Sequence, residues 1–234
     1  MIDLYSLATP NGQKVSIALE EMGLSYTPHT IDITKGDQFK PEFLAVNPNS
    51  KIPAIVDQDG PGGKPLAVFE SGAILVYLAK KSGMFLSKDP RLESETLQWL
   101  FFQVGGIGPM FGQFGHFYKY AADKCEHPYP VERYKAESKR LLKVLDTHLG
   151  GGSGAQATGA QANGPKAAPS ERKFLVGEEY SIADMATMPW VHCLSVFYGA
   201  SDVLELESFP HVRAWVARCL ERPKTAAGMK VCGT

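Results

Sequence analysis

The sequence predicts two parts, a small α/β domain over residues 1–82 and an all-helical domain over residues 90–234. Two observations support this division. Strand-like and helix-like segments alternate up to about residue 82, and beyond it the remaining periodic segments are helical. A loop over residues 82–90 separates the two kinds of pattern. We therefore place the domain boundary near residue 85.

The first domain has its elements in the order βαβ and then ββα. The βαβ half comprises a strand, a helix, a second strand and a short helix that opens on proline, over residues 2–5, 15–22, 26–33 and 41–44. The ββα half comprises a hairpin and a helix that begins at Glu70-Ser71, with hairpin strands at 54–57 and 66–69. This order predicts a small mixed sheet with helices on its faces.

The second domain is expected to contain four helices. They run from Arg91 past Gln103 and then over residues 131–149, 181–196 and 209–220. Residues 150–170 consist almost wholly of Gly, Ala, Gln, Ser and Pro. Such a segment has too few apolar side chains to fold alone, so we expect a flexible insert there.

Composition excludes several classes of protein. The formal net charge is −1, so no basic surplus exists to bind nucleic acid. The sequence starts without a secretory pattern and has no apolar run long enough for a membrane span. His116 and His192 have no partner at metal-ligand spacing, so no metal is expected. The widely spaced cysteines form no CxxC and suit free thiols in the cytoplasm: Cys125, Cys193, Cys219 and Cys232.

Three segments could carry chemistry, and the first contains Ile52-Pro53. The simpler interpretation of this pair is an edge strand or a tight turn before the following strand, because proline lacks a ladder donor. Alternatively, a cis bond would turn the N–H and C=O of Ile52 outward. A bound peptide could then pair with these two groups as an extra strand.

The second segment is Glu70-Ser71. Ser71 stands where the N-cap of the following helix is expected, which by itself favours a purely structural role. The same position could hold a carboxylate, because a helix N-terminus offers free N–H groups. Glu70 beside it could accept an ammonium group. Together they would suit the head group of an amino acid.

The third segment is Thr9-Pro10-Asn11-Gly12. In the simpler interpretation Asn11 caps the first helix and Thr9 shapes the turn. Alternatively, these donors and the positive helix end would lower the pKa of a bound thiol. No cysteine lies in this loop, so such a thiolate must come from the ligand.

Together these segments resemble the cytosolic glutathione transferases, most closely the Nu class and its fungal relatives that are similar to a nitrogen regulator. The resemblance covers nearly the whole chain apart from the insert and the extreme C-terminus. It implies an α/β thioredoxin-like N-terminal domain plus an all-α C-terminal helical domain. The matching segments are residues 9–12, 36–39, 41–43, 47–57, 69–74, 98–101, 105–110, 132–134 and 180–184.

The resemblance also implies roles for individual residues. It assigns catalytic contacts with the glutathione sulfur to Thr9 and Asn11, and binding of the γ-glutamyl head to Glu70 and Ser71. The position of Arg133 implies a homodimer, because in such proteins it reaches into the neighbouring subunit's site. The cysteinyl-glycine half of glutathione is assigned to Gln38 and to the segment of Lys51, Ile52 and Pro53.

The function that the resemblance implies is reduction of small disulfides with glutathione as the redox partner. Bound glutathione thiolate attacks the disulfide, and a second glutathione resolves the product. Two alternatives remain: a detoxifying transferase that conjugates electrophiles, and a non-catalytic regulatory module. Leu7 stands near where such transferases usually have a catalytic tyrosine, so a mechanism based on Ser6 also remains open.

Three further motifs are expected to be structural. Ser181 and Asp184 form a capping box, in which aspartate replaces the more usual glutamate. The glycines at 105–108 are expected to break or kink a long helix, since no strand precedes them as in a phosphate-binding loop. An aromatic cluster could line a co-substrate pocket, although core packing is favoured for most of its members: Phe111, Phe114, Phe117 and Tyr118.

Overall fold

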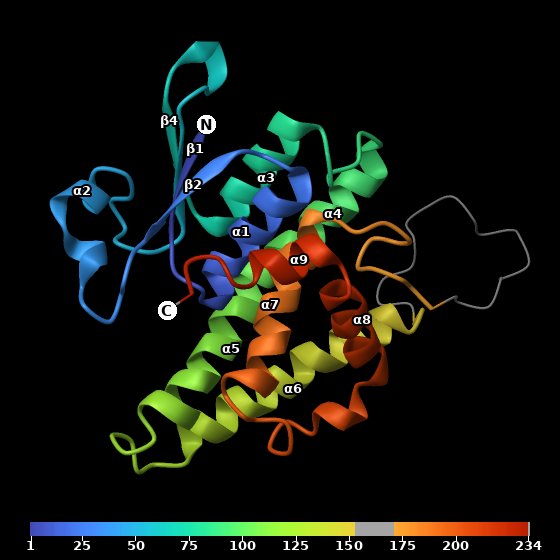
Figure 1. The fold of residues 1–234 in the computed structure, drawn as a ribbon. Helices are drawn as coiled ribbons and strands as arrows, with labels where there is room; N and C mark the ends of the chain where they lie inside the picture. The colour runs from blue at the N-terminus through green and yellow to red at the C-terminus, as the bar shows by residue number, and fades with distance from the viewer. Residues whose placement is uncertain (153–170, 234) are drawn as a thin grey trace, which may run out of the picture.

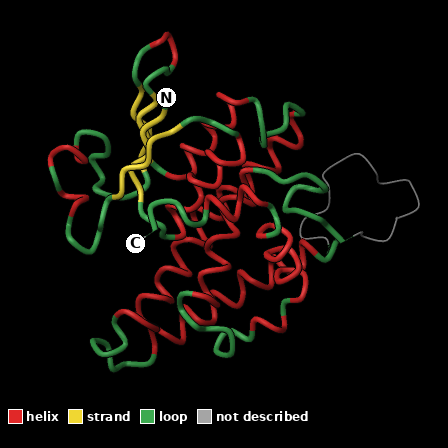
Figure 2. Tube along the Cα trace, viewed as in Figure 1, coloured by secondary structure: helices red, strands yellow, loops and turns green. Residues whose placement is uncertain are grey.

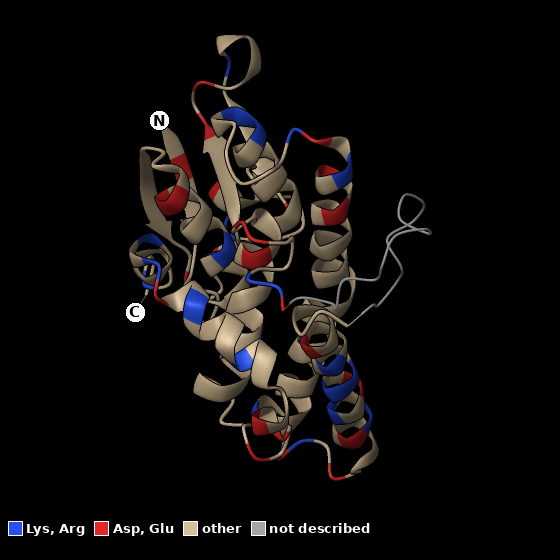
Figure 3. Cartoon of the chain, turned by 90° about the vertical axis from the view of Figure 1, so that its right-hand side faces the viewer, with Lys and Arg blue, Asp and Glu red and all other residues tan. Residues whose placement is uncertain are grey.

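The computed structural model describes residues 1–152 and 171–233 (Figure 1). Residues 153–170, which make up most of the predicted insert, lie outside the described residues. Within the described part, no helix is long and apolar enough to cross a membrane. Lysine and arginine are interspersed with aspartate and glutamate along the chain (Figure 3).

A four-stranded mixed sheet organises the N-terminal part, as predicted. The strands lie in the order β2-β1-β3-β4; β1 and β2 are parallel, and the other two pairs are antiparallel (Figure 2). Helices α1 and α3 lie on one side of the sheet, and the short helix α2 lies beyond the other (Figure 1). The elements are β1 (Ile2–Ser6), α1 (Pro10–Met22), β2 (Tyr26–Thr30), α2 (Pro41–Leu44), β3 (Ala54–Asp57), β4 (Leu66–Phe69) and α3 (Ser71–Ser82).

The described residues after α3 are mostly helical, with more helices than predicted. The glycines at 105–108 do not end the helix: it continues through the π-helical turn η3 into α5 and the second π-helical turn η4. Helices α5 and α9 were not predicted, and α7 carries the expected capping box. The elements are α4 (Pro90–Phe102), η3 (Gln103–Ile107), α5 (Gly108–Gly115), η4 (His116–Tyr120), α6 (Tyr129–Leu149), α7 (Ile182–Val196), α8 (Pro210–Leu220) and α9 (Pro223–Gly228).

The capping box does more than begin a helix. Asp184 is fully buried and accepts hydrogen bonds from the backbone N–H of Leu175 at 2.9 Å and from the Trp215 indole at 2.8 Å. It also accepts from the backbone N–H and the hydroxyl of Ser181, both at 3.0 Å. Burial raises the pKa of Asp184, and these four donors oppose that rise. The motif therefore ties α7 to α8 and to the segment before it.

Helix α1 begins in the third candidate segment, Thr9-Pro10-Asn11-Gly12, and lies between the two parts. On one side it packs against α3, and on the other against α7 and α9. Ser16 donates a hydrogen bond to the carbonyl of Gly228 at 2.7 Å, and the Ala8 N–H donates to the carbonyl of Cys232 at 3.2 Å. The C-terminal segment thus lies beside the loop that leads into α1 (Figure 1).

Candidate functional site

The loop between β1 and α1 presents Thr9 and Asn11 at the start of a helix. Thr9 is the N-cap: its backbone is extended, and its hydroxyl accepts a hydrogen bond from the Gly12 N–H at 3.3 Å. The prediction that Asn11 caps the helix was therefore wrong. Pro10 occupies the first helical position, which proline favours, and so the cap falls on the residue before it.

Asn11 instead makes a contact with the helical part of the chain. Its side-chain oxygen accepts a hydrogen bond from the indole N–H of Trp190, in α7, at 2.9 Å. The Trp190 side chain is buried, whereas Asn11 is half-buried. The candidate thiol-contacting residues therefore lie where α1 meets α7.

Ser6 lies in a different environment from Thr9 and Asn11. It is only 1% exposed, and its hydroxyl donates to the carbonyl of Leu7 at 3.4 Å. A Cβ atom placed on Gly12 would come within 2.5 Å of that hydroxyl. The Ser6 side chain is thus enclosed against α1, which favours Thr9 and Asn11 as donors to a ligand.

The turn before α3 presents Glu70 and Ser71. Glu70 is the N-cap by position and has φ 70° and ψ 114°, outside the regions that non-glycine residues usually occupy. Such a conformation costs on the order of 1–3 kcal/mol and is concentrated at functional sites. Ser71 is the first helical residue, so the prediction that it is the N-cap was wrong by one position. The Glu70 side chain is exposed, while Ser71 is 9% exposed.

A buried lysine lies behind this turn. Lys14 is 2% exposed, and its ammonium donates hydrogen bonds to the Ser71 hydroxyl at 3.2 Å and to the Gln103 side-chain oxygen at 2.6 Å. Burial lowers the pKa of Lys14 to about 7, although the negative charge of Glu70 opposes this shift. A carboxylate bound at Ser71 would favour the protonated, positively charged form of Lys14. That charge would in turn stabilise the bound carboxylate.

Sequence reasoning missed Lys14, although the sequence held a signal. Lys14 lies four residues before Ala18, on the face of α1 that the helical periodicity marks as buried. A lysine on an apolar face needs a partner or a ligand, because an unpaired buried charge is costly. Its partners Ser71 and Gln103 are 57 and 89 residues away, so no local pattern reveals them.

The segment before β3 presents the backbone of Ile52. The Ile52-Pro53 peptide bond is cis, the conformation that the functional interpretation of this pair requires. The buried Asn47 side chain holds the preceding loop, because its amide donates to the Lys51 carbonyl at 2.6 Å. Among the described residues, neither the N–H nor the C=O of Ile52 is hydrogen-bonded. Both are therefore available to an extended peptide.

Gln38 and Arg133, two further predicted ligand contacts, lie on other elements. Gln38 is in a short 3₁₀ turn (η1, Asp37–Phe39), where its amide donates to the Ile33 carbonyl at 3.3 Å. Its side-chain oxygen is buried and has no partner within the described chain. Arg133 is exposed on α6, in the helical part. Arg133 therefore lies on a different element from the other candidate ligand contacts.

The cysteines are free and lie outside the loop of Thr9 and Asn11. Cys193 and Cys219 are buried. Burial raises the pKa of the Cys193 thiol to about 11, and it also raises the pKa values of Cys219 and Cys232. Because the thiolate is the reactive form, these three thiols are poor nucleophiles at neutral pH. No group of three or more metal-ligating side chains occurs in the part of the chain that the structure describes.

Much of the predicted aromatic pocket is core. Phe111 and Phe114 are fully buried, as the packing interpretation requires, while Phe117 and Tyr118 are half-buried. Phe114 stacks on Tyr118 with ring centroids 5.0 Å apart, and Phe117 stacks on Tyr134 at 5.7 Å. These rings hold α5, η4 and α6 together.

Comparison with known proteins agrees with this arrangement. Residues 8–81 match the family of the glutathione S-transferase N-terminal domain, and residues 164–223 match that of the C-terminal domain. The chain is 45% identical to the disulfide-bond oxidoreductase YfcG of Escherichia coli, over 98% of this chain and 94% of the relative.

Two solved structures are similar over nearly the whole chain. A glutathione transferase family member from Pseudomonas fluorescens, with two glutathione molecules bound, has a TM-score of 0.88 and 50% identity over 98% of this chain and 92% of its own. A glutathione transferase from Pseudomonas putida, with one glutathione disulfide bound per subunit, has a TM-score of 0.87. It is 49% identical over 98% of this chain and 90% of its own. Sequence and structure thus agree that this chain belongs to the glutathione S-transferase family.

Proposed function

We propose that this protein reduces disulfide bonds with glutathione as the source of both thiols. The observation that carries the proposal is the start of α1, where Thr9 and Asn11 offer polar groups at a helix N-terminus in a loop without cysteine. The positive end of a helix and nearby donors favour a thiolate. The nucleophile itself is then the thiol of bound glutathione.

The proposed orientation of glutathione follows from three features of the first domain. Glu70 accepts the ammonium of the γ-glutamyl head. Ser71 binds the carboxylate of the same head group, with Lys14 behind it. The backbone of Ile52 pairs with the cysteinyl residue as an added strand. Gln38 and Lys51 are proposed to hold the glycine end, and Pro53 fixes the cis bond.

The proposed reaction consists of two thiol–disulfide exchanges. The bound thiolate attacks one sulfur of the substrate disulfide; a mixed disulfide forms, and one substrate thiolate leaves and takes up a proton. A second glutathione thiolate then attacks the glutathione sulfur of the mixed disulfide. Glutathione disulfide forms, and the second substrate thiolate leaves. The relatives that bind two glutathione molecules or glutathione disulfide support this scheme, as does the relative named as a disulfide-bond oxidoreductase.

Comparing two substrates tests this function. With hydroxyethyl disulfide and glutathione we expect rapid formation of glutathione disulfide, and with a chlorinated nitrobenzene we expect slow conjugation. The alternative function, conjugation of electrophiles, predicts the reverse order. If the protein binds glutathione but shows neither activity, the result would favour the regulatory module. The proposed setting is the cytoplasm, where glutathione is the main thiol reductant.

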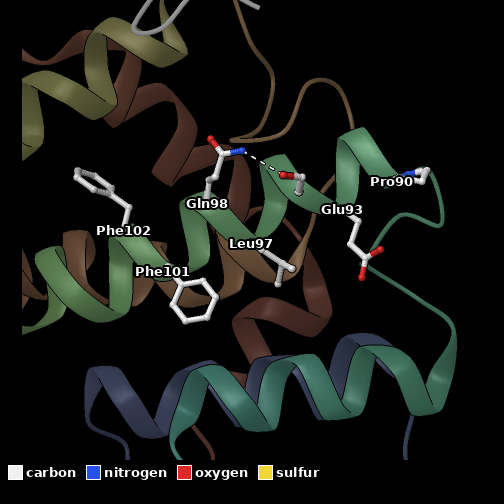
Figure 4. Close-up of a pocket in the computed structure, with 7 residues that line it drawn as sticks. Pro90, Glu93, Leu97, Gln98, Phe101 and Phe102 are labelled. Atoms are coloured by element: carbon white, nitrogen blue, oxygen red, sulfur yellow. Dashed lines mark hydrogen bonds between the residues drawn. The ribbon is translucent and has the colours of Figure 1, made fainter. Parts of the chain in front are cut away.

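We also propose a homodimer, formed through the exposed face of α4. Phe101, a large apolar side chain on this face, is 69% exposed. A cavity of about 660 Å³ lies on this face (Figure 4), lined by Pro90, Glu93, Ser94, Leu97, Gln98, Phe101 and Phe102. A second copy that covers this face would bury these side chains. In that dimer Arg133 is proposed to reach the partner's site.

Changing Phe101 to glutamate is expected to separate the dimer, because it puts a charge into an apolar interface. Light scattering at micromolar concentration should give twice the 25.5 kDa mass for the wild type and the single mass for Phe101→Glu. Phe39→Glu, at a side chain that is 65% exposed on η1, is the matched control and should stay dimeric. A monomeric wild type would contradict both the interface and the role of Arg133.

A further inference from the structure

Trp190 makes a contact whose chemistry fixes the orientation of the Asn11 amide. The indole N–H of Trp190 donates to the Asn11 side-chain oxygen at 2.9 Å. An indole nitrogen can only donate, whereas an asparagine amide can either donate or accept. The bond therefore forms only when the Asn11 oxygen faces α7. The amide NH₂ then faces away from Trp190, free to donate elsewhere.

Two glycines of α5 leave room for the indole of Trp190. A Cβ atom on Gly112 would come within 3.3 Å of the Trp190 ring, and one on Gly108 within 3.4 Å of its nitrogen. The indole thus lies against a glycine surface of α5, and it is only 7% exposed. The small size of Gly108 and Gly112 therefore lets α5 pack closely on Trp190. This packing role is separate from the π-helical turn η3.

We propose that Trp190 is a positioning residue for the thiolate: it holds the Asn11 amide with its NH₂ toward the glutathione sulfur. This inference rests on the proposed function, in which Asn11 contacts that sulfur. An amide that is free to rotate would present its oxygen part of the time, and an oxygen repels a thiolate. Trp190, from the helical domain, thereby sets the chemistry of a residue in the N-terminal domain.

Replacing Trp190 with phenylalanine tests this role, because the change retains an aromatic ring and removes the N–H. We expect the pKa of the bound glutathione thiol, followed by thiolate absorbance, to rise by roughly half to one pH unit. The rate of disulfide reduction at neutral pH should fall about three- to tenfold, as expected for the loss of one neutral hydrogen bond. The KM for glutathione should change little, since the γ-glutamyl head is bound elsewhere.

Trp99→Phe is the matched control, because Trp99 lies in α4 and packs on Phe102 and on His148 of α6, away from Asn11. It should leave the thiol pKa unchanged. An unchanged thiol pKa in a folded Trp190→Phe protein would overturn the proposal, as would a higher KM for glutathione with no change in that pKa. The second result would mean that Trp190 only packs.

Asn11→Asp provides a second test, independent of how Trp190→Phe folds. The carboxylate still accepts the indole N–H, but its other oxygen now faces the sulfur. We expect a higher thiol pKa in Asn11→Asp than in Asn11→Ala, and an equal or lower value would overturn the proposed orientation. A wild type that ionises bound glutathione but reduces no disulfide would contradict the proposed function alone, because the thiol titrations would still test Trp190.

Discussion

Asn11→Ala is expected to lower the rate of disulfide reduction about ten- to a hundredfold at saturating glutathione. A hydrogen bond to a charged group contributes about 1.5–3 kcal/mol, and each 1.4 kcal/mol corresponds to about a tenfold change in rate. Part of the loss is offset, because a thiolate with fewer donors is intrinsically more nucleophilic. Steady-state kinetics with hydroxyethyl disulfide measure the effect. A rate equal to the wild-type rate would remove Asn11 from the site.

Thr9 offers a comparison within the same loop. Thr9→Ala removes a proposed donor to the thiolate and also the N-cap of α1, so it should lower both the rate and, by about 1 kcal/mol, the stability. Thr9→Ser retains the hydroxyl and should retain both properties. Because Asn11 is not the cap, Asn11→Ala should lower the rate with little loss of capping. Chemical denaturation of the three variants separates the two effects.

Glu70→Ala is expected to weaken glutathione binding by about ten- to a hundredfold, because the ammonium of the γ-glutamyl head loses its charged partner. A second effect adds to the first. The charge of Glu70 opposes the fall in the pKa of Lys14, so its removal leaves Lys14 more often neutral. The carboxylate of the same head group then loses part of its positive partner.

Calorimetry measures this loss directly. Glu70→Gln retains the size of the side chain and removes its charge, so it should also bind weakly. Glu221→Ala, an exposed glutamate at the end of α8, is the matched control and should bind like the wild type. Wild-type affinity in Glu70→Ala would contradict the proposed position of the head group.

Local patterns in the sequence predicted most of the fold. The hairpin of β3 and β4 was predicted at its observed bounds, because two short, mostly apolar segments flank a turn rich in glycine. The second strand was predicted over 26–33 but ends at Thr30. Among the described strands its neighbour is β1, which ends at Ser6. Ser6 pairs with Thr30 and accepts a last hydrogen bond from the Ile31 N–H at 2.8 Å, so β1 offers no partner beyond that point. The extent of this strand thus depends on a distant segment.

The same limit explains what was missed at the candidate site. Residue type and family resemblance indicated four candidate residues, but two cap positions were assigned incorrectly. The candidates are Thr9, Asn11, Glu70 and Ser71. The contact of Trp190 with Asn11 joins residues 179 positions apart, and no periodicity reveals such a pair. The domain bounds and the ligand contacts of these residues remain predictions.

Glutathione, and no protein thiol, is proposed to carry the exchange. The most direct measurement is the disulfide-reduction rate of a protein without cysteine, with all four changed to serine or alanine: Cys125, Cys193, Cys219 and Cys232. Compared with Asn11→Ala at saturating glutathione, the cysteine-free protein should keep most of the wild-type rate while Asn11→Ala loses most of it. A folded but inactive cysteine-free protein beside a fully active Asn11→Ala would contradict the glutathione-only mechanism and mean that a protein thiol carries the exchange.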